Sequence, residues 1–319
     1  MTRFIKKTVF FIIPVVAFLC MADYGLSRIL KTSNLSENTV WRDVIDGNIN
    51  ANVAIYGSSR AWTILSPEII GDTLHASVYN MGLDGHNLNL QLLRHTLYFK
   101  YNRKPKTIIH SIEIFTLQKR KDLYNPDQFL PYMLWDKSIR EFTSGYEGYK
   151  TLDYYLPGAR YYGKTTAMHN AYNVLAHPAS NKPERIKGYQ GIDEQWNDDF
   201  DNAQKQIEFY EAVLDTPTMI QFENYIKEIT SSEINLVLVY APEYIEGQKF
   251  IRNRQEIMNV FLTVSKKYNV PFIDYSNDQL CYDKAYFYNA THLNKKGSEI
   301  FSGRLASDVK KLLIGKQAG

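Results

Sequence analysis

The sequence predicts an α/β fold of three layers, with about five parallel strands in a central sheet and helices on both faces. Short β-branched, apolar runs alternate along the chain with stretches whose leucines recur at helical spacing. Strands that alternate with helices indicate a parallel sheet, because each crossover helix returns the chain to the same edge. An apolar run precedes this pattern, and a long aromatic-rich segment interrupts it.

Five runs are expected to form the strands: "ANVAIYG" from 51, "ASVYNMG" from 76, "TIIHSIEIF" from 107, "INLVLVYAP" from 234 and "VPFIDYS" from 270. Ser66 is expected to begin a helix, because a capping residue is followed by proline at the first helical position. Further helices are expected over 86–100, near 250–268 and after Asn294. The predicted sheet domain therefore covers 51–117 and 221–319.

Residues 118–220 are predicted to be a folded, mostly helical insertion, since a structureless loop of this length is uncommon in a compact domain. The insertion is rich in tyrosine and tryptophan. Two uses of these rings stay open: they form the insertion's own core, or they offer flat faces to sugars and protein partners. We expect some of Tyr154, Tyr155, Tyr161 and Tyr162 to be exposed beside the functional site.

The N-terminus predicts a location outside the cytoplasm. Arg3, Lys6 and Lys7 precede an uncharged run from Val9 to Ala22. This run is shorter than the ~20 residues that span a bilayer and is similar in length to the core of a signal peptide. The alternatives are a signal cleaved after Ala22 and a buried helix, but the basic flank favours an anchor with the rest of the chain outside. We assign 1–30 to a signal anchor and 31–50 to a membrane-proximal stalk.

Composition excludes several other functions. The formal net charge is only +3, which gives no case for nucleic-acid binding. No cysteine and histidine spacing suits zinc, so we expect no metal and no cofactor. Residues 158–165 fit the pattern of a phosphate-binding loop, but two tyrosines fill it and no buried strand precedes it.

Two polar positions point to chemistry. Ser58 and Ser59 lie in the turn "GSSR" after the first strand, and His292 lies in "FYNATHLNKKGSEIF" beyond the last strand. The simpler interpretation is a small-residue turn in which Ser59 caps the next helix. However, ligands of α/β proteins bind at the carboxyl edge of the sheet, where both Ser59 and His292 are expected. A histidine that accepts the proton of a serine makes that serine a nucleophile.

In their order and spacing, these residues resemble the SGNH/GDSL hydrolase superfamily over about 51–115 and 230–313. Gly57-Ser58-Ser59 matches the first block, Gly82 in "YNMGLDG" the second, and the segment 289–292 the final Asp-x-x-His block. The resemblance implies a three-layer, flavodoxin-like fold.

The same resemblance implies the roles of the site residues. Ser59 would be the nucleophile, His292 the base and Asn289 the group that orients it. The amides of Ser59 and Gly82 would stabilise the oxyanion. The "APE" and "VPFIDYS" segments resemble the membrane-anchored branch, including D-alanyl-transfer and alginate-acetylation proteins, which work with membrane-bound O-acyltransferases.

The chain departs from the family pattern at two places. Asn289 stands where the family has aspartate, and the Gly-x-Asn-Asp block after the third strand is absent, leaving Glu113 and Thr116. An asparagine oxygen can orient a histidine but carries no charge to balance an imidazolium. In a serine protease, replacing the triad aspartate by asparagine lowers turnover ~10⁴-fold.

We therefore expect serine-dependent acyl transfer or ester hydrolysis on a cell-envelope polysaccharide, with a membrane-bound O-acyltransferase as partner. The alternative is a catalytically degenerate relative that binds glycan or acts as a scaffold in the envelope. Asn289 and the missing asparagine block favour that alternative.

Overall fold

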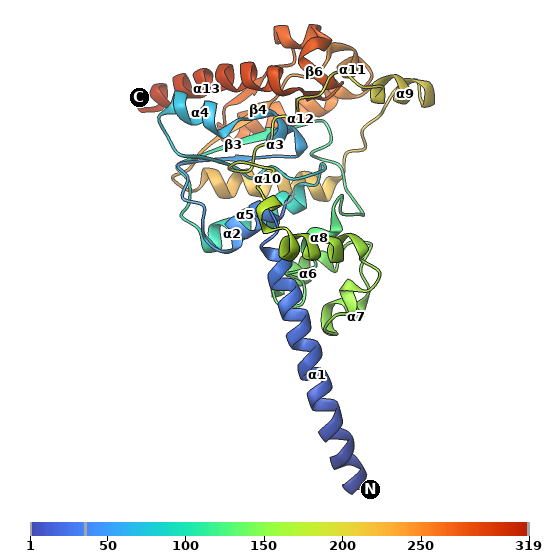
Figure 1. The fold of residues 1–319 in the computed structure, drawn as a ribbon. Helices are drawn as coiled ribbons and strands as arrows, with labels where there is room; N and C mark the ends of the chain where they lie inside the picture. The colour runs from blue at the N-terminus through green and yellow to red at the C-terminus, as the bar shows by residue number, and fades with distance from the viewer. Residues whose placement is uncertain (1, 35–36, 318–319) are drawn as a thin grey trace. The chain divides into compact units, whose positions relative to one another are not determined.

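The computed structural model describes residues 2–34 and 37–317 (Figure 1). The chain divides into two units. The anchor unit comprises 1–42 and 121–184, and the sheet unit comprises 43–120 and 185–319. The predicted insertion thus contributes 121–184 to the anchor unit and its remainder to the sheet unit, and the boundaries drawn from the sequence stay a prediction.

Five parallel strands form the central sheet, which confirms the predicted fold class. They are β1 (Val53–Tyr56), β2 (Val78–Asn80), β3 (Thr107–Ile112), β4 (Asn235–Tyr240) and β5 (Phe272–Asp274), in the order β2-β1-β3-β4-β5. The chain leaves β1 for β2 on one side and returns to β3 on the other. The carboxyl end of β1 is therefore the switch point where ligands of such sheets bind.

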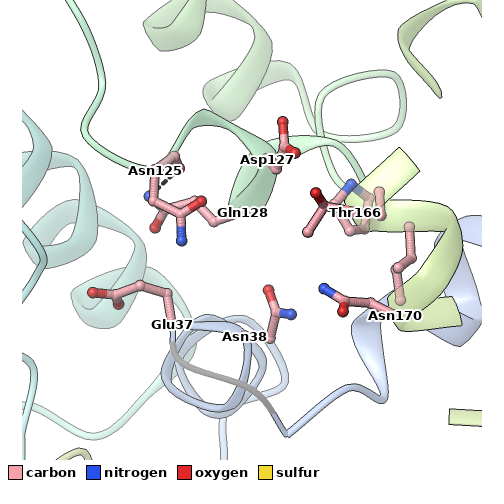
Figure 2. Close-up of a pocket in the computed structure, with 10 residues that line it drawn as sticks. Glu37, Asn38, Asn125, Asp127, Gln128, Thr166 and Asn170 are labelled. Atoms are coloured by element: carbon pink, nitrogen blue, oxygen red, sulfur yellow. Dashed lines mark hydrogen bonds between the residues drawn. The ribbon is translucent and has the colours of Figure 1, made fainter. Parts of the chain in front are cut away.

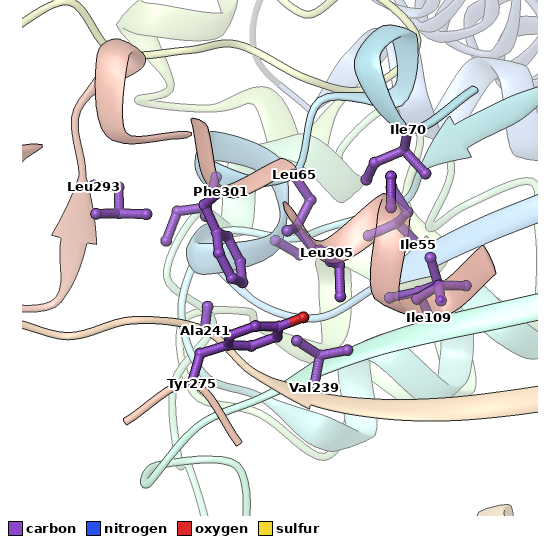
Figure 3. Close-up of a cluster of buried hydrophobic side chains, with 14 of the residues drawn as sticks. Ile55, Leu65, Ile70, Ile109, Val239, Ala241, Tyr275, Leu293, Phe301 and Leu305 are labelled. Carbon is purple, nitrogen blue, oxygen red and sulfur yellow. The ribbon is translucent and has the colours of Figure 1, made fainter. Parts of the chain in front are cut away.

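One face of the sheet is covered by α3 (Ser59–Ile64), α4 (Pro67–Leu74) and α13 (Lys295–Gln317). Figure 3 shows Ile55, Ile109 and Val239 of the strands packed with Phe301 and Leu305 of α13. Side chains alternate between the two faces of a strand, so the neighbouring residues face the opposite layer. A strand buried on both faces explains the nearly continuous apolar runs in the sequence.

The opposite layer contains α5 (Leu88–Tyr101), α10 (Thr216–Thr230) and α12 (Arg254–Tyr268), with α10 contacting the other two helices and β4. Tyr56 of β1 points into this layer, where its hydroxyl lies 2.9 Å from Nδ1 of His95. The sheet unit also holds α9 (Asp199–Gln206), α11 (Ile245–Lys249), the short helices η4 (Gln279–Tyr282) and η5 (Lys284–Tyr286), and the antiparallel pair β6 (Phe287–Asn289) and β7 (His292–Leu293). The helix α2 (Asn38–Ile45) joins the two units in sequence.

The anchor unit is built around α1 (Thr2–Lys31). Its other helices are η1 (Pro126–Phe129), α6 (Lys137–Thr143), α7 (Thr151–Tyr155), η2 (Ala159–Tyr161), α8 (Thr165–Ala176) and η3 (Pro178–Ser180). Among the described residues, α1 is the one helix long and apolar enough to cross a membrane, over Lys6–Lys31. Its large apolar side chains from Val9 to Met21 are exposed.

Polar side chains near the C-terminal end of α1 are buried within the anchor unit. Asp23 accepts hydrogen bonds from Arg160 at 2.6 and 2.8 Å and from the backbone N–H of Gly158 at 2.7 Å. The hydroxyl groups of Ser27 and Tyr161 lie 2.8 Å apart. A buried charge is stable only when it is paired, so these contacts hold the turn at 158–161 against α1.

The four tyrosines singled out in the insertion have two different environments. Tyr154 and Tyr161 are buried, each 6% exposed, whereas Tyr155 and Tyr162 are 69% and 93% exposed. Two of the four tyrosines are therefore exposed. Their position beside the functional site stays a prediction.

The anchor unit also contains a polar cavity of about 160 Å³ (Figure 2). Figure 2 shows the side chains of Asn38 and Asn170 turned toward its centre, with Asn125 and Thr166 at its border. Asp127 also borders it and forms an ion pair with Lys164 at 2.9 Å. The cavity therefore offers amide and hydroxyl groups to a ligand.

Candidate active site

The turn after β1 presents Ser59 to the switch point. Gly57 has a φ of +143°, and a Cβ there would lie 2.7 Å from the carbonyl oxygen of Ser111, so only glycine fits. Ser58 is the N-cap of α3, and its hydroxyl accepts the N–H of Arg60 at 3.2 Å. The interpretation that Ser59 caps this helix is wrong, because Ser58 does so. The Ser59 hydroxyl is left for another partner.

That partner is His292, which is 233 positions away in the sequence. The Oγ of Ser59 lies 2.8 Å from Nε2 of His292. The histidine begins β7, in the hairpin that carries the chain from η5 into α13. The ring of Tyr288 stacks on the imidazole at 5.2 Å between centroids, which restricts the tilt of the histidine ring.

Asn289 holds the other nitrogen of the same imidazole. Its Oδ1 accepts the backbone N–H groups of Thr291 and His292, at 3.1 and 3.0 Å, and lies 3.0 Å from Nδ1 of His292. An oxygen that receives these N–H groups is an acceptor, so Nδ1 carries the proton donated to it. This assignment, made from the hydrogen-bond network, leaves Nε2 unprotonated and facing Ser59.

Thr291 was not identified from the sequence as part of the site. Its Oγ1 lies 2.9 Å from Nδ1 of His292 and donates to Oδ1 of Asn289 at 3.2 Å. The structure thus brings the predicted Ser59, His292 and Asn289 together and adds a hydroxyl to them. The imidazole is oriented without a carboxylate.

The electrostatic environment keeps His292 neutral. Desolvation, with a smaller contribution from the nearby Arg60 cation, lowers the pKa of His292 to about 3. The ring is therefore an unprotonated base at neutral pH. The same environment would destabilise the imidazolium formed if His292 took the proton of Ser59. Asn289 presents only an uncharged amide oxygen to the ring, so no anion balances that positive charge.

Arg60, directly after Ser59, forms a buried ion pair with Glu243 of the "APE" segment. Nη1 of Arg60 donates to Oε1 of Glu243 at 2.6 Å, and both side chains are at most 2% exposed. Nη2 donates to the carbonyl of Ala241 at 2.6 Å, and Tyr240 donates its hydroxyl to Glu243. These contacts fix the turn that carries Ser59 to the loop after β4. This pair was not identified from the sequence, because its two members are 183 residues apart.

Glu113 and Thr116 occupy the place of the family's Gly-x-Asn-Asp block. Burial raises the pKa of Glu113, although Arg60 and the hydroxyl of Ser58 act in the opposite direction. The N–H of Glu113 donates to Oγ1 of Thr116 at 2.9 Å, so Thr116 closes the turn after β3. Neither residue supplies the amide donor that an asparagine would.

The predicted oxyanion donors differ in their availability. The N–H of Gly82 donates to Oδ1 of Asn80 at 2.9 Å. A Cβ at Gly82 would lie 2.7 Å from the backbone N of Trp62, so this glycine allows close packing against α3. Ser59 is the first residue of α3, and its N–H has no acceptor within the helix. The oxyanion role of both amides stays a prediction, and that of Gly82 requires its N–H to leave Asn80.

No group of three or more His, Cys, Asp or Glu side chains that could hold a metal ion occurs within 2–34 and 37–317.

No protein-family model and no curated protein matches the sequence. Among solved structures, the chain is similar to a family two carbohydrate esterase from Clostridium thermocellum in complex with cellohexaose. The identity is 10%, over 83% of this chain and 65% of that chain, with a TM-score of 0.41. It is also similar to a GDSL-like lipase from Bacteroides thetaiotaomicron, at 10% identity over 81% of this chain and 88% of that chain, with a TM-score of 0.35. These matches are distant.

The five-stranded parallel sheet makes this chain an α/β protein, and its strand order, with Ser59 after β1 and His292 before α13, is consistent with the SGNH-like fold that the sequence predicts. Its function is inferred below from the geometry of the site itself.

Proposed function

We propose that the chain is a membrane-anchored, extracytoplasmic enzyme that transfers or hydrolyses acyl esters of a cell-envelope polysaccharide. The observation that carries the proposal is the 2.8 Å contact between Ser59 Oγ and His292 Nε2. The second ring nitrogen is held by Asn289 at 3.0 Å, so the unprotonated nitrogen faces the serine. A serine nucleophile activated in this way attacks carbonyl carbon.

The proposed reaction has two halves. Ser59 Oγ attacks the ester carbonyl while His292 Nε2 takes its proton. The tetrahedral intermediate collapses to an acyl-serine, and the proton passes to the departing alkoxide. Water or a glycan hydroxyl then attacks the acyl-serine and gives its proton to His292, which returns it to the departing Ser59 Oγ. Because the imidazolium lacks a facing carboxylate, we expect slow turnover.

The anchor unit supports the proposed location. The large apolar side chains of α1 are exposed from Val9 to Met21, and Asp23 then ties the helix to the turn at 158–161. Tyr155 and Tyr162 are exposed next to this turn, and tyrosine is enriched where membrane meets water. A membrane-bound O-acyltransferase is the partner we propose, on the resemblance to the anchored branch of the family.

A second candidate function is glycan binding without catalysis. Two observations favour it: Asn289 leaves the histidine without a carboxylate, and the cavity in Figure 2 offers amide groups that suit sugar hydroxyls.

Labelling of the purified full chain by a fluorophosphonate probe separates the two candidates. We expect labelling of the wild type and none of Ser59→Ala, with Ser58→Ala as the matched control that still labels. Labelling that survives Ser59→Ala and disappears in Ser58→Ala would place the nucleophile one residue earlier. Failure of the folded wild type to label favours glycan binding.

A further inference from the structure

An apolar pocket of about 210 Å³ borders the hairpin that carries His292. Segments from four parts of the sheet unit meet there: the loop after β3, α9 with the strand-like segment after it, α11, and the hairpin. Figure 1 shows α9, α11 and β6 at the same end of this unit. The side chains that form most of its wall are Phe115, Phe200, Ala203, Tyr210, Phe250 and Ile251.

Two walls of this pocket belong to the segments that flank Ser59. On one side, Phe115 follows β3 and contacts His86 of the loop after β2, with 5.0 Å between ring centroids. Because β1 lies between β2 and β3, this contact passes beside the carboxyl end of β1, where Ser59 is placed. On the other side, Asn289 and Thr291 line the pocket and also contact Nδ1 of His292.

The chemistry of the wall favours a hydrocarbon occupant. Phe200 contacts Phe250 at 5.6 Å and Phe115 contacts Tyr210 at 5.4 Å between centroids, so carbon surfaces dominate. The polar side chains of the lining are Asp199, Asn289 and Thr291. The side-chain oxygens of Asn289 and Thr291 already contact His292, and the carboxylate of Asp199 accepts a hydrogen bond from Asn197 at 2.8 Å. A sugar would need more polar partners than these. The acyl chain of an ester needs no polar partner in the pocket, because it carries no polar group beyond the carbonyl.

The volume sets the size of that acyl group. An apolar protein cavity of about 150 Å³ binds benzene, which has six carbons. A pocket of about 210 Å³ is larger, and an acetyl group would leave most of it unfilled. We propose that this pocket holds the acyl chain of the ester attacked by Ser59, with a length of about six to eight carbons. The proposal rests on the proposed function and extends it by naming the class of acyl group.

A chain-length series tests the proposal on the full chain in lipid nanodiscs. With p-nitrophenyl esters from acetate to decanoate, kcat/KM is expected to rise about fourfold per methylene, the equivalent of ~0.8 kcal/mol, up to hexanoate or octanoate. Ala203→Phe fills the pocket and is expected to lower kcat/KM for hexanoate about tenfold or more while leaving acetate unchanged. Gln204→Phe is the matched control, since it adds the same ring to α9 outside the lining.

Two results would overturn the proposal that the pocket binds the acyl chain. One is equal kcat/KM for acetate and hexanoate, and the other is an equal effect of Ala203→Phe and Gln204→Phe. Neither result would contradict ester hydrolysis itself. If the wild type cleaves no ester, the proposed function fails, and the pocket is tested by calorimetry of octanoate binding to Ser59→Ala. Binding that Ala203→Phe removes and Gln204→Phe retains supports the pocket. Lack of octanoate binding to Ser59→Ala overturns it.

Discussion

An arginine–carboxylate pair with both side chains at most 2% exposed occurs in each unit, and these two pairs serve different ends. Asp23 and Arg160 join segments 137 residues apart in the anchor unit, and Arg60 and Glu243 join segments 183 residues apart in the sheet unit. The first is surrounded by Ser27, the N–H of Gly158 and the indole of Trp135, which donates to Asp23 at 3.0 Å.

The second pair lies beside Ser59, and its cation contributes to the low pKa of His292. The same kind of ion pair therefore ties α1 to the turn at 158–161 in one unit and sets the charge around a candidate base in the other. Removing one partner of either pair leaves a buried charge uncompensated, which costs ~3–5 kcal/mol. A change of charge near Ser59 should also alter chemistry, whereas one at Asp23 should not.

The largest effect is expected from adding a charge to the sheet unit. Asn289→Asp places a carboxylate at Nδ1 of His292, where it raises the pKa of the ring and stabilises the imidazolium against the Arg60 cation. Hydrolysis of an aryl acetate is expected to rise by ~10²- to 10⁴-fold, the converse of the loss in a serine protease. Background activity in a folded Asn289→Asp protein would instead indicate that the missing oxyanion donor or a closed crevice limits the reaction, and would favour the non-catalytic function.

The second-largest effect is expected from neutralising the carboxylate of each buried ion pair. Glu243→Gln and Asp23→Asn are each expected to destabilise their own unit by ~3–5 kcal/mol, measured by chemical unfolding of the full chain. Fluorophosphonate labelling per folded molecule should change in Glu243→Gln and stay at the wild-type level in Asp23→Asn. Unchanged labelling in both variants would show that the sheet-unit pair is structural as well.

The pH dependence of labelling sharpens the same contrast. A histidine with the ordinary pKa near 6.5 loses its activity as pH falls through that value. Because the pKa of His292 is lowered to about 3, labelling of the wild type is expected to stay constant from pH 7 down to about 4. In Asn289→Asp, the pH at which labelling declines on acidification should be higher than in the wild type. A wild-type midpoint near 6.5 would contradict the proposed environment of the ring.

The stability of the folded chain should also fall with pH because of His292. The unfolded chain binds a proton at this histidine below about pH 6.5, whereas the folded chain does so only near its lowered pKa of about 3. Stability is therefore lost as pH falls between these values. His292→Gln is expected to remove this part of the acid destabilisation, measured as the change in unfolding midpoint between pH 7 and pH 4.5.

The smallest effect is expected at the helix cap. Ser58→Ala removes the side-chain acceptor for the N–H of Arg60 and should cost ~1 kcal/mol of stability. Labelling per folded molecule should persist, because Ser59 keeps its contact with His292. A loss of labelling as large as that of Ser59→Ala would mean that Ser58 takes part in the reaction.

The local pattern of the sequence determined the sheet and the meeting of the predicted site residues. β-branched runs, helical leucine spacing and capping residues act over a few positions, so they predict strands and helices directly. Parallel strands share one carboxyl edge, and this alone places Ser59 after β1 near His292 beyond β5. Asn289 follows because it lies three residues before His292 in the same hairpin.

Tertiary structure decided everything that depends on distances between remote segments. The pairing of Arg60 with Glu243 and the division of 118–220 between two units have no local signature. The contact of Thr291 with Nδ1 of His292 depends on a side-chain direction that the hairpin sets. A buried charge takes whichever partner the packed chain brings within reach, and sequence separation does not encode that distance.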